Sequence, residues 1–142
     1  HTLSLHDALP ILAVWNFEDL SPMVNPVGEL GEFLSGAVVE VFQISDKYRV
    51  VEREKLALAL EELNLGTSAL ADENTQLKLG RLVGARWMVF GGYQVIGDSM
   101  RLDLRKVDVE TGAVIKAAEK TVDSADISAW IAGAKAAAAE LL

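Results

Sequence analysis

The stretch from Trp87 to Ile96 is apolar on both sides, and this is the strongest pattern in the chain. Successive residues of a strand point to opposite faces, and here both alternating sets are hydrophobic. One set is Trp87, Val89, Tyr93 and Val95, and the other is Met88, Phe90 and Ile96. Strands of this kind are typical of a largely parallel sheet with helices on both faces. The pattern therefore predicts a three-layer α/β/α domain with this strand at its centre.

Four segments show features of helices. Residues 27–44 have apolar and polar positions at three- and four-residue spacing, with Leu30, Leu34, Val38 and Val41 on one stripe and Glu29, Glu32, Gly36, Glu40 and Gln43 on the other. Residues 53–63 form a second helix with Leu56, Leu60 and Leu63 inward, and residues 72–83 form a third that ends at Gly84. An alanine-rich fourth helix is predicted from residue 127 to the last residue, 142, capped by Asp126 or Ser128.

The remaining patterns predict strands and turns. Residues 12–17 form a buried strand followed by a loop at residues 18–26, and residues 48–52 form a short edge strand. Residues 100–109 alternate cleanly, with Met100, Leu102 and Leu104 facing the core and Arg101, Asp103 and Arg105 facing outward. Tight turns at residues 97–99 and 110–112 connect this strand to its neighbours. Residues 113–122 then form a charged edge strand carrying Lys116, Glu119 and Lys120.

Glycines and aromatic residues are interpreted here as structural. Gly80 and Gly84 are four residues apart and predict a close approach of the third helix to the sheet. Gly91 and Gly92 lie inside a strand, which favours close packing of a neighbouring group over a phosphate-binding loop. Among the aromatic residues, Trp130, near the start of the last predicted helix, is the one that could reach a partner.

Composition limits the possible functions. The chain has 142 residues, 51% of them hydrophobic, which is enough for one buried core without disulfides. Its net charge of -8 disfavours nucleic acid and anionic membranes as partners and favours a basic protein. Its longest apolar runs are much shorter than the ~20 residues of a membrane-spanning helix. These features predict one soluble domain.

Residues 1–11 do not fit the rest of the chain. The string from Thr2 to Ile11 is similar to a translated sequencing-adapter primer. We interpret residues 1–11 as an artefact and residues 12–142 as a single domain. Both histidines, His1 and His6, lie in the excluded stretch, so the predicted domain contains no histidine.

The predicted domain lacks the usual catalytic side chains. Without histidine or cysteine it cannot form a nucleophilic triad, a histidine general base or an ordinary zinc site. Its neighbouring carboxylates occur at helix starts and turns, where they are expected as caps. We therefore predict no catalytic residue, no cofactor and no metal, and a small nucleotide- or metal-dependent enzyme remains the less favoured alternative.

Four motifs, taken in order, resemble the curli-secretion-channel (CsgG-type) family and, more distantly, the amino-terminal domain of TolB. They are residues 16–19 (NFED), 49–56 (RVVEREKL), 79–92 (LGRLVGA to VFGG) and 107–112 (VDVETG). The resemblance implies an anticodon-binding-domain-like fold with a mixed five-stranded sheet. Numbered along the chain, its strands have the order 2-1-3-4-5, and the fourth is antiparallel.

The resemblance also implies a place in the cell. Family members are mostly exported proteins of the bacterial envelope and are often lipoproteins, so a periplasmic or outer-membrane-associated location is expected. The channel-forming members insert long membrane hairpins at two positions, which here hold only residues 97–99 and 123–125. A membrane-spanning barrel strand needs ~9–11 residues. We therefore predict no membrane insertion by this domain.

The expected function is a non-enzymatic contact with other envelope proteins or with copies of the same chain. The alternative is a TolB-like docking or sensor module of a larger repeat-containing protein. The proposed contact site is the loop after the first strand, which combines apolar residues with few charges. Its residues are Pro22, Met23, Val24, Asn25 and Pro26. The competing interpretation is that Met23 and Val24 cover the end of the sheet.

Overall fold

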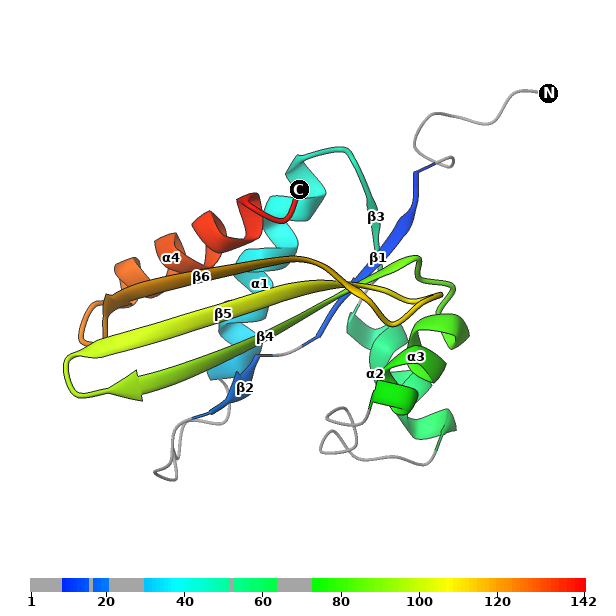
Figure 1. Ribbon diagram of the computed structural model, residues 1–142, viewed down its shortest axis with the longest axis horizontal. Coiled ribbons are helices and arrows are strands. Elements are labelled where there is room, and N and C mark those ends of the chain that lie inside the picture. Colours follow the sequence, from blue (N-terminus) through cyan, green and yellow to red (C-terminus); the bar gives the residue numbers. More distant parts are fainter. Residues whose placement is uncertain (1–8, 16, 21–29, 52, 64–72) are drawn as a thin grey trace.

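The computed structural model describes residues 9–15, 17–20, 30–51, 53–63 and 73–142. The described residues form one sheet with helices against both faces (Figure 1). In sequence order the elements are β1 (Ile11–Val14), β2 (Glu18–Asp19), α1 (Leu30–Ile44), β3 (Arg49–Val50), α2 (Arg53–Glu62), α3 (Glu73–Leu82), β4 (Trp87–Ile96), β5 (Ser99–Asp108), β6 (Val114–Asp123) and α4 (Ile127–Ala139).

The sheet has the order β3-β1-β4-β5-β6. β1 pairs in parallel with β3 and β4, and β5 pairs antiparallel with β4 and β6. These are the five predicted strands, so the predicted order and the antiparallel fourth strand are confirmed. β1 begins at Ile11, which pairs with Arg49. Residue 11 therefore takes part in the sheet, and the origin of residues 1–11 stays a prediction.

The prediction of a loop starting at Glu18 is wrong at its first residues. Glu18 and Asp19 form β2, which pairs in parallel with Gly92 and Tyr93 of β4. β1 pairs only with the first three residues of β4, from Trp87 to Val89, and leaves the rest of that edge unpaired. β2 pairs with the backbone of β4 further along this edge, and the N–H of Leu20 donates a hydrogen bond to the carbonyl of Tyr93 at 2.8 Å. The chain therefore continues along β4 before it leaves the sheet.

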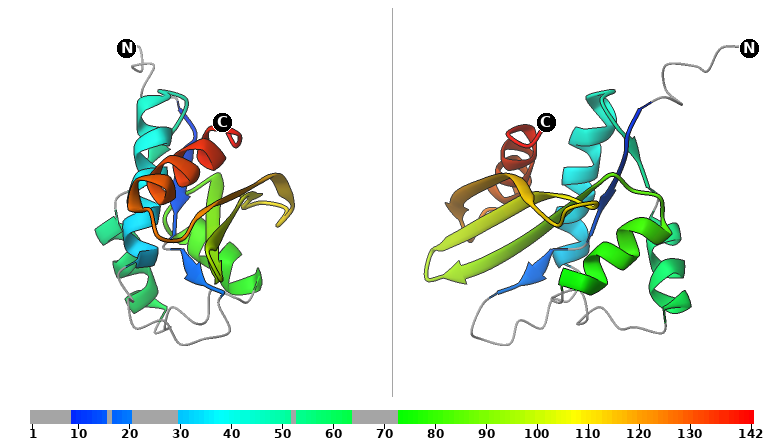
Figure 2. Two further views of the ribbon diagram at one scale, coloured as in Figure 1. Left: turned by 90° about the vertical axis from the view of Figure 1, so that its left-hand side faces the viewer. Right: turned by 45° about the vertical axis from the view of Figure 1, so that its right-hand side comes forward.

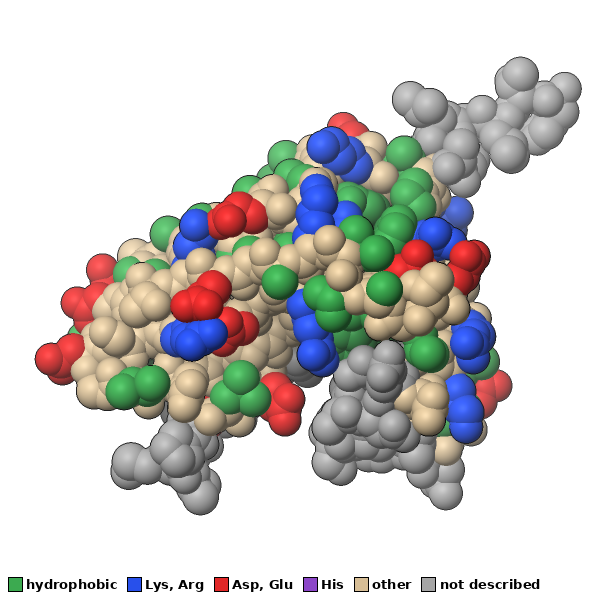
Figure 3. Space-filling model, in the orientation of Figure 1, with side chains coloured by type: hydrophobic (Ala, Val, Ile, Leu, Met, Phe, Trp, Pro, Cys, Tyr) green, Lys and Arg blue, Asp and Glu red, His purple; other side chains and the backbone are tan. Residues whose placement is uncertain are grey.

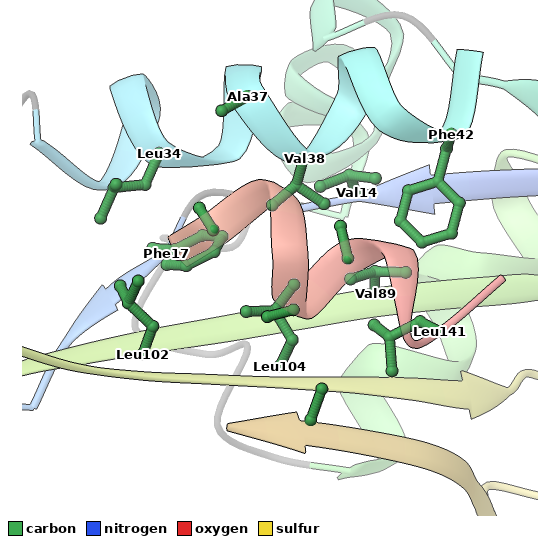
Figure 4. Close-up of a cluster of buried hydrophobic side chains, with 14 of the residues drawn as sticks. Val14, Phe17, Leu34, Ala37, Val38, Phe42, Val89, Leu102, Leu104 and Leu141 are labelled. Carbon is green, nitrogen blue, oxygen red and sulfur yellow. The ribbon is translucent and has the colours of Figure 1, made fainter. Parts of the chain in front are cut away.

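α1 and α4 cover one face of the sheet along its length (Figure 2). Leu30, Leu34 and Val38 of the predicted stripe are buried, whereas its last member, Val41, is half-buried and the neighbouring Phe42, which was not assigned to the stripe, is fully buried instead. Glu32, Gly36, Glu40 and Gln43 are exposed, as predicted. Figure 4 shows Leu34, Val38 and Phe42 pointing from α1 towards the side chains of Val89, Leu102 and Leu104. α4 adds small residues, Ala134, Ala137 and Ala138, which allow the helix to lie close to β5 and β6.

α2 and α3 cover the other face at one end only (Figures 1 and 2). There Leu56, Ala59, Leu79 and Val83 pack on Ala13, Trp15, Met88, Phe90, Val107 and Val109. No described helix lies over this face beyond Phe90. Ile96 is 61% exposed, so the prediction that β4 is buried on both faces is wrong for its last residues. Leu63 is half-buried, and the side chain of Leu60, also predicted inward, lies outside the described residues.

The glycines have different roles. A Cβ on Gly80 would lie 2.8 Å from Val109 Cγ1, which confirms the predicted close approach of α3. Gly84 is needed for another reason, because its φ of +74° ends the helix and no group crowds it more closely than 3.9 Å. The ring of Phe17 packs on Gly91 and the side chain of Leu20 packs on Gly92. The two glycines therefore allow close packing of neighbouring groups, as predicted.

The start of α4 is as predicted, but its end is not. The Asp126 carboxylate accepts hydrogen bonds from the N–H groups of Ser128 and Ala129 and caps the helix. The helix ends at Ala139, three residues before the predicted end, and Leu141 turns into the core with no exposed surface. Burial of Leu141 against α1 and the sheet therefore competes successfully with continuation of the helix.

Candidate interaction surfaces

The predicted contact residues Pro22, Met23, Val24, Asn25 and Pro26 all lie outside the described residues. The described residue nearest to them on the amino-terminal side is Leu20, which is 46% exposed. Its side chain packs over Gly92 on the face of β4 that α2 and α3 leave uncovered. The proposed contact at these five residues therefore stays a prediction.

The uncovered face of β4, β5 and β6 forms a polar surface, here called the open sheet face. Strand alternation and register place on it, among others, Gln94, Ile96, Arg101, Asp103, Arg105, Glu119 and Thr121. Arg101 donates to Asp103 at 3.1 Å and to Glu119 at 2.9 Å, and the Arg105 guanidinium lies 5.3 Å from the Phe90 ring centre. Figure 3 shows mainly backbone and uncharged polar atoms over β4, β5 and β6, with a few charged and hydrophobic side chains among them. The surface is thus exposed sheet with locally paired charges.

The far end of the sheet, here called the tip, brings two turns together. Gly97, with a φ of +59°, turns β4 into β5, and Ser124 lies in the turn from β6 to α4. The Ser124 N–H donates to the carbonyl of Asp98 at 2.9 Å, and its hydroxyl donates to the carbonyl of Gly97 at 3.2 Å. These are the two positions at which the resemblance places membrane hairpins in channel-forming relatives. In this chain the two short turns are hydrogen-bonded to each other.

Lys106 is a buried cation that sequence reasoning did not single out. Its Nζ donates to the hydroxyl of Tyr48 at 2.9 Å and lies 5.2 Å from the Trp87 ring centre and 5.3 Å from the Tyr48 ring centre. It forms no ion pair with a described residue. The signal was present, since Lys106 continues the inward series of Met100, Leu102 and Leu104. The hydrogen bond and the two rings stabilise the ammonium group and give it a structural role.

Arg86 and Asp108 explain the motif at residues 107–112. The Asp108 carboxylate accepts from Arg86 at 3.2 Å and from the N–H of Glu110 at 2.8 Å, and Gly112 adopts the positive φ that was predicted. The hydrogen bond with Glu110 raises the pKa of Arg86, and the charge of Asp108 acts in the same direction. The motif therefore folds the turn between β5 and β6.

The described residues offer little chemistry. They contain no group of three or more metal-binding side chains, and none of their helices is long and apolar enough to cross a membrane. Trp130 is half-buried and donates from Nε1 to the carbonyl of Asp123 at 3.0 Å, so it holds the turn before α4. Its contact with a partner stays a prediction. Trp15 is buried, and its Nε1 has no hydrogen-bond partner among the described residues.

A mixed open sheet with these helices defines an α/β domain, and comparison with protein families identifies it further. The chain belongs to the CsgG family, described as the curli production assembly/transport component, whose model matches residues 7–97. The resemblance read from the four motifs is therefore confirmed. Among curated proteins no match to the chain was found.

Solved structures share the fold at low sequence identity. The LpoB C-terminal domain from Salmonella enterica is 20% identical with a TM-score of 0.65, over 83% of this chain and 87% of that one. The PelC dodecamer from Paraburkholderia phytofirmans is 14% identical with a TM-score of 0.55, over 100% and 90%. TolB from Acinetobacter baumannii is 16% identical with a TM-score of 0.53, over 85% of this chain and 25% of TolB. At these identities the likeness shows the fold alone.

Proposed function

We propose that this chain is a non-enzymatic domain of the bacterial cell envelope that works by protein–protein contact within an assembly. The observation that carries the proposal is the match of residues 7–97 to a family described as an assembly and transport component. The partners are other envelope proteins or further copies of the chain. The dodecamer formed by PelC, which shares the fold, supports self-association as one form of this contact.

The described surface supports contact over catalysis. The open sheet face presents side chains that pair with one another, and no group of described residues is arranged as a metal site. The tip supports the proposal that the domain inserts nothing into a membrane, because both of its turns are short and mutually bonded. A periplasmic or outer-membrane-associated location, as a lipoprotein, is part of the proposal.

Site-specific photo-crosslinking in the native host tests this function. A photo-reactive amino acid at Thr121, on the open sheet face, should give discrete crosslinked products in the envelope fraction. The matched control is the same replacement at Ala136, exposed on the outside of α4. Sedimentation of the purified protein over a range of concentrations shows whether one partner is a second copy. Recovery of the protein in the cytoplasm, with no product at either position, would contradict the proposal.

The predicted loop is proposed as one contact within this function. Replacing Met23 and Val24 together with serine should weaken self-association or partner recovery while the melting temperature changes little. Unchanged association with a markedly lower melting temperature would show that the two residues serve packing.

A second candidate function is a docking module of a larger protein. It is favoured by the likeness to TolB, in which this fold makes up 25% of a longer chain. It predicts that the native gene encodes helical or other repeats after this domain. Sequencing the native transcript on both sides of the region separates the two candidates.

A further inference from the structure

β3 is an edge strand of the described sheet. The N–H groups of Arg49 and Val51 donate towards β1, to the carbonyls of Pro10 and Leu12, each at 2.9 Å. Backbone groups of successive residues in a strand point to opposite sides, so the N–H and C=O of Val50 point away from β1. No described strand pairs with that side. An unpaired donor and acceptor of this kind can receive another strand.

A cleft of about 500 Å³ runs along this open edge. Four consecutive residues line it, Tyr48, Arg49, Val50 and Val51, so the edge itself forms part of its wall. The end of α1 borders the cleft on one side of the sheet, and Lys55 of α2 borders it on the other. Because the cleft wraps around the edge, a segment added beside β3 would contact both sides.

The two sides of the cleft differ in chemistry. Tyr48 and Val50 point to the α1 side, where Val50 packs on the main core. Arg49 points to the α2 side, where exposed Lys55 also lies. A strand seated here would place alternate side chains against apolar groups and against cations.

Two cations of the cleft have no ion-pair partner in the part of the chain that the structure describes. Arg49 and Lys55 form no ion pair with a described residue, whereas Arg86, Arg101, Lys120 and Lys135 do. Asp46 also lines the cleft and partly offsets this charge. In a chain with a net charge of -8, an edge with two unpaired cations is complementary to an acidic segment. This local preference is opposite to the basic partner that net charge alone predicts.

We propose that the cleft binds an extended segment of a partner protein, which adds a strand to β3 and alternates apolar with acidic side chains. Backbone bonds to Val50 provide attachment, and Arg49 and Lys55 select the acidic positions. The inference rests on the proposed function, because it names one contact of a domain that works through protein partners.

A synthetic peptide tests the proposal on the whole chain. The probe is an acetylated, amidated peptide in which valine alternates with aspartate, titrated into isotope-labelled protein. We expect saturable amide shift changes at residues 48–51 and at Lys55. The same peptide with lysine in place of aspartate should not bind. Alternate amides of the peptide can be N-methylated in two ways, and methylation of the set that faces β3 should abolish binding, whereas methylation of the other set should not.

Variants separate recognition from folding. Lys55→Glu should weaken binding of the aspartate peptide roughly tenfold and allow the lysine peptide to bind, whereas Lys78→Glu, the same charge change on exposed α3, should do neither. Val50→Pro removes the outward N–H and should abolish binding with the charges kept.

The proposal is overturned if the peptide causes no saturable change, if the changes map elsewhere, or if Lys55→Glu and Lys78→Glu behave alike. Crosslinks from Thr121 do not depend on β3. If they persist while the peptide fails, the cleft assignment is wrong and the proposed function stands. If both fail, the proposed function is wrong as well.

Discussion

Near β1, β4 is packed on both faces, whereas near the tip it is packed on one. Met88, Val89 and Phe90 in the first part are buried between two helical layers, while Ile96 in the last part is exposed on one side. Helix length explains the difference. α2 and α3 have ten residues each and span about 15 Å. β4 also has ten residues but spans about 33 Å. A further helix on the α2 and α3 side would be needed to cover the last residues of β4.

Phe90→Ala should have the largest effect on this comparison. The ring is buried under the α2 and α3 layer, so its loss should lower the free energy of unfolding by about 3–5 kcal/mol. Urea unfolding followed by circular dichroism measures it. A loss below about 1 kcal/mol would mean that the two-sided packing near β1 is not tight.

Gly80→Ala and Gly36→Ala form a matched pair on two helices. A methyl group at Gly80 would meet Val109 and Met88 and should destabilise the protein by about 1–2 kcal/mol. At Gly36, where nothing lies within 4 Å of the added carbon, the same change should stabilise it by about 0.5–1 kcal/mol. The same unfolding assay applies, and equal signs for the two variants would refute the close approach of α3.

Asp126→Ala removes the cap of the helix that covers the sheet near the tip. It should cost about 1 kcal/mol, because the N–H groups of Ser128 and Ala129 lose their acceptor. Amide hydrogen exchange should accelerate first in α4 and β6, while α2 and α3 keep their protection. Equal acceleration of exchange in all four helices would show that loss of the cap is not confined to α4 and the strands next to it.

Changes on the open sheet face should have the smallest effects. Ile96→Ala and Arg101→Ala should each change stability by less than about 1 kcal/mol, because Ile96 is already exposed and the Arg101 ion pairs are in contact with solvent. Thermal melting of both variants checks this. A larger loss would show that another group covers this face in the protein.

Much of the fold was predictable because its signals are local. The alternation of Met100, Leu102 and Leu104 and the positive φ of Gly112 depend on neighbours in sequence. The strand order came from the family resemblance, since periodicity does not say which strands pair. β2 was missed because Glu18 and Asp19 carry no apolar pattern, and their pairing depends on how far β4 extends beyond β1.

The candidate sites were less predictable. The contact at residues 22–26 was predicted from composition alone, and it stays a prediction. The cleft was not foreseen because Gln43, Arg49 and Lys55 come together from a helix, a strand and a second helix. The structural role of Trp130 was not foreseen, because its indole finds an acceptor in the turn before its own helix.

The paired turns of the tip also bear on how such a domain diversifies. Strand pairing resumes at once beyond the turn, with Ile96 opposite Ser99, so a longer excursion there would leave the register of β4 and β5 intact. Lengthening a loop costs little conformational entropy, about 0.6 kcal/mol for each doubling. The two neighbouring turns of the tip are therefore the positions at which we expect a pair of insertions to disturb the core least.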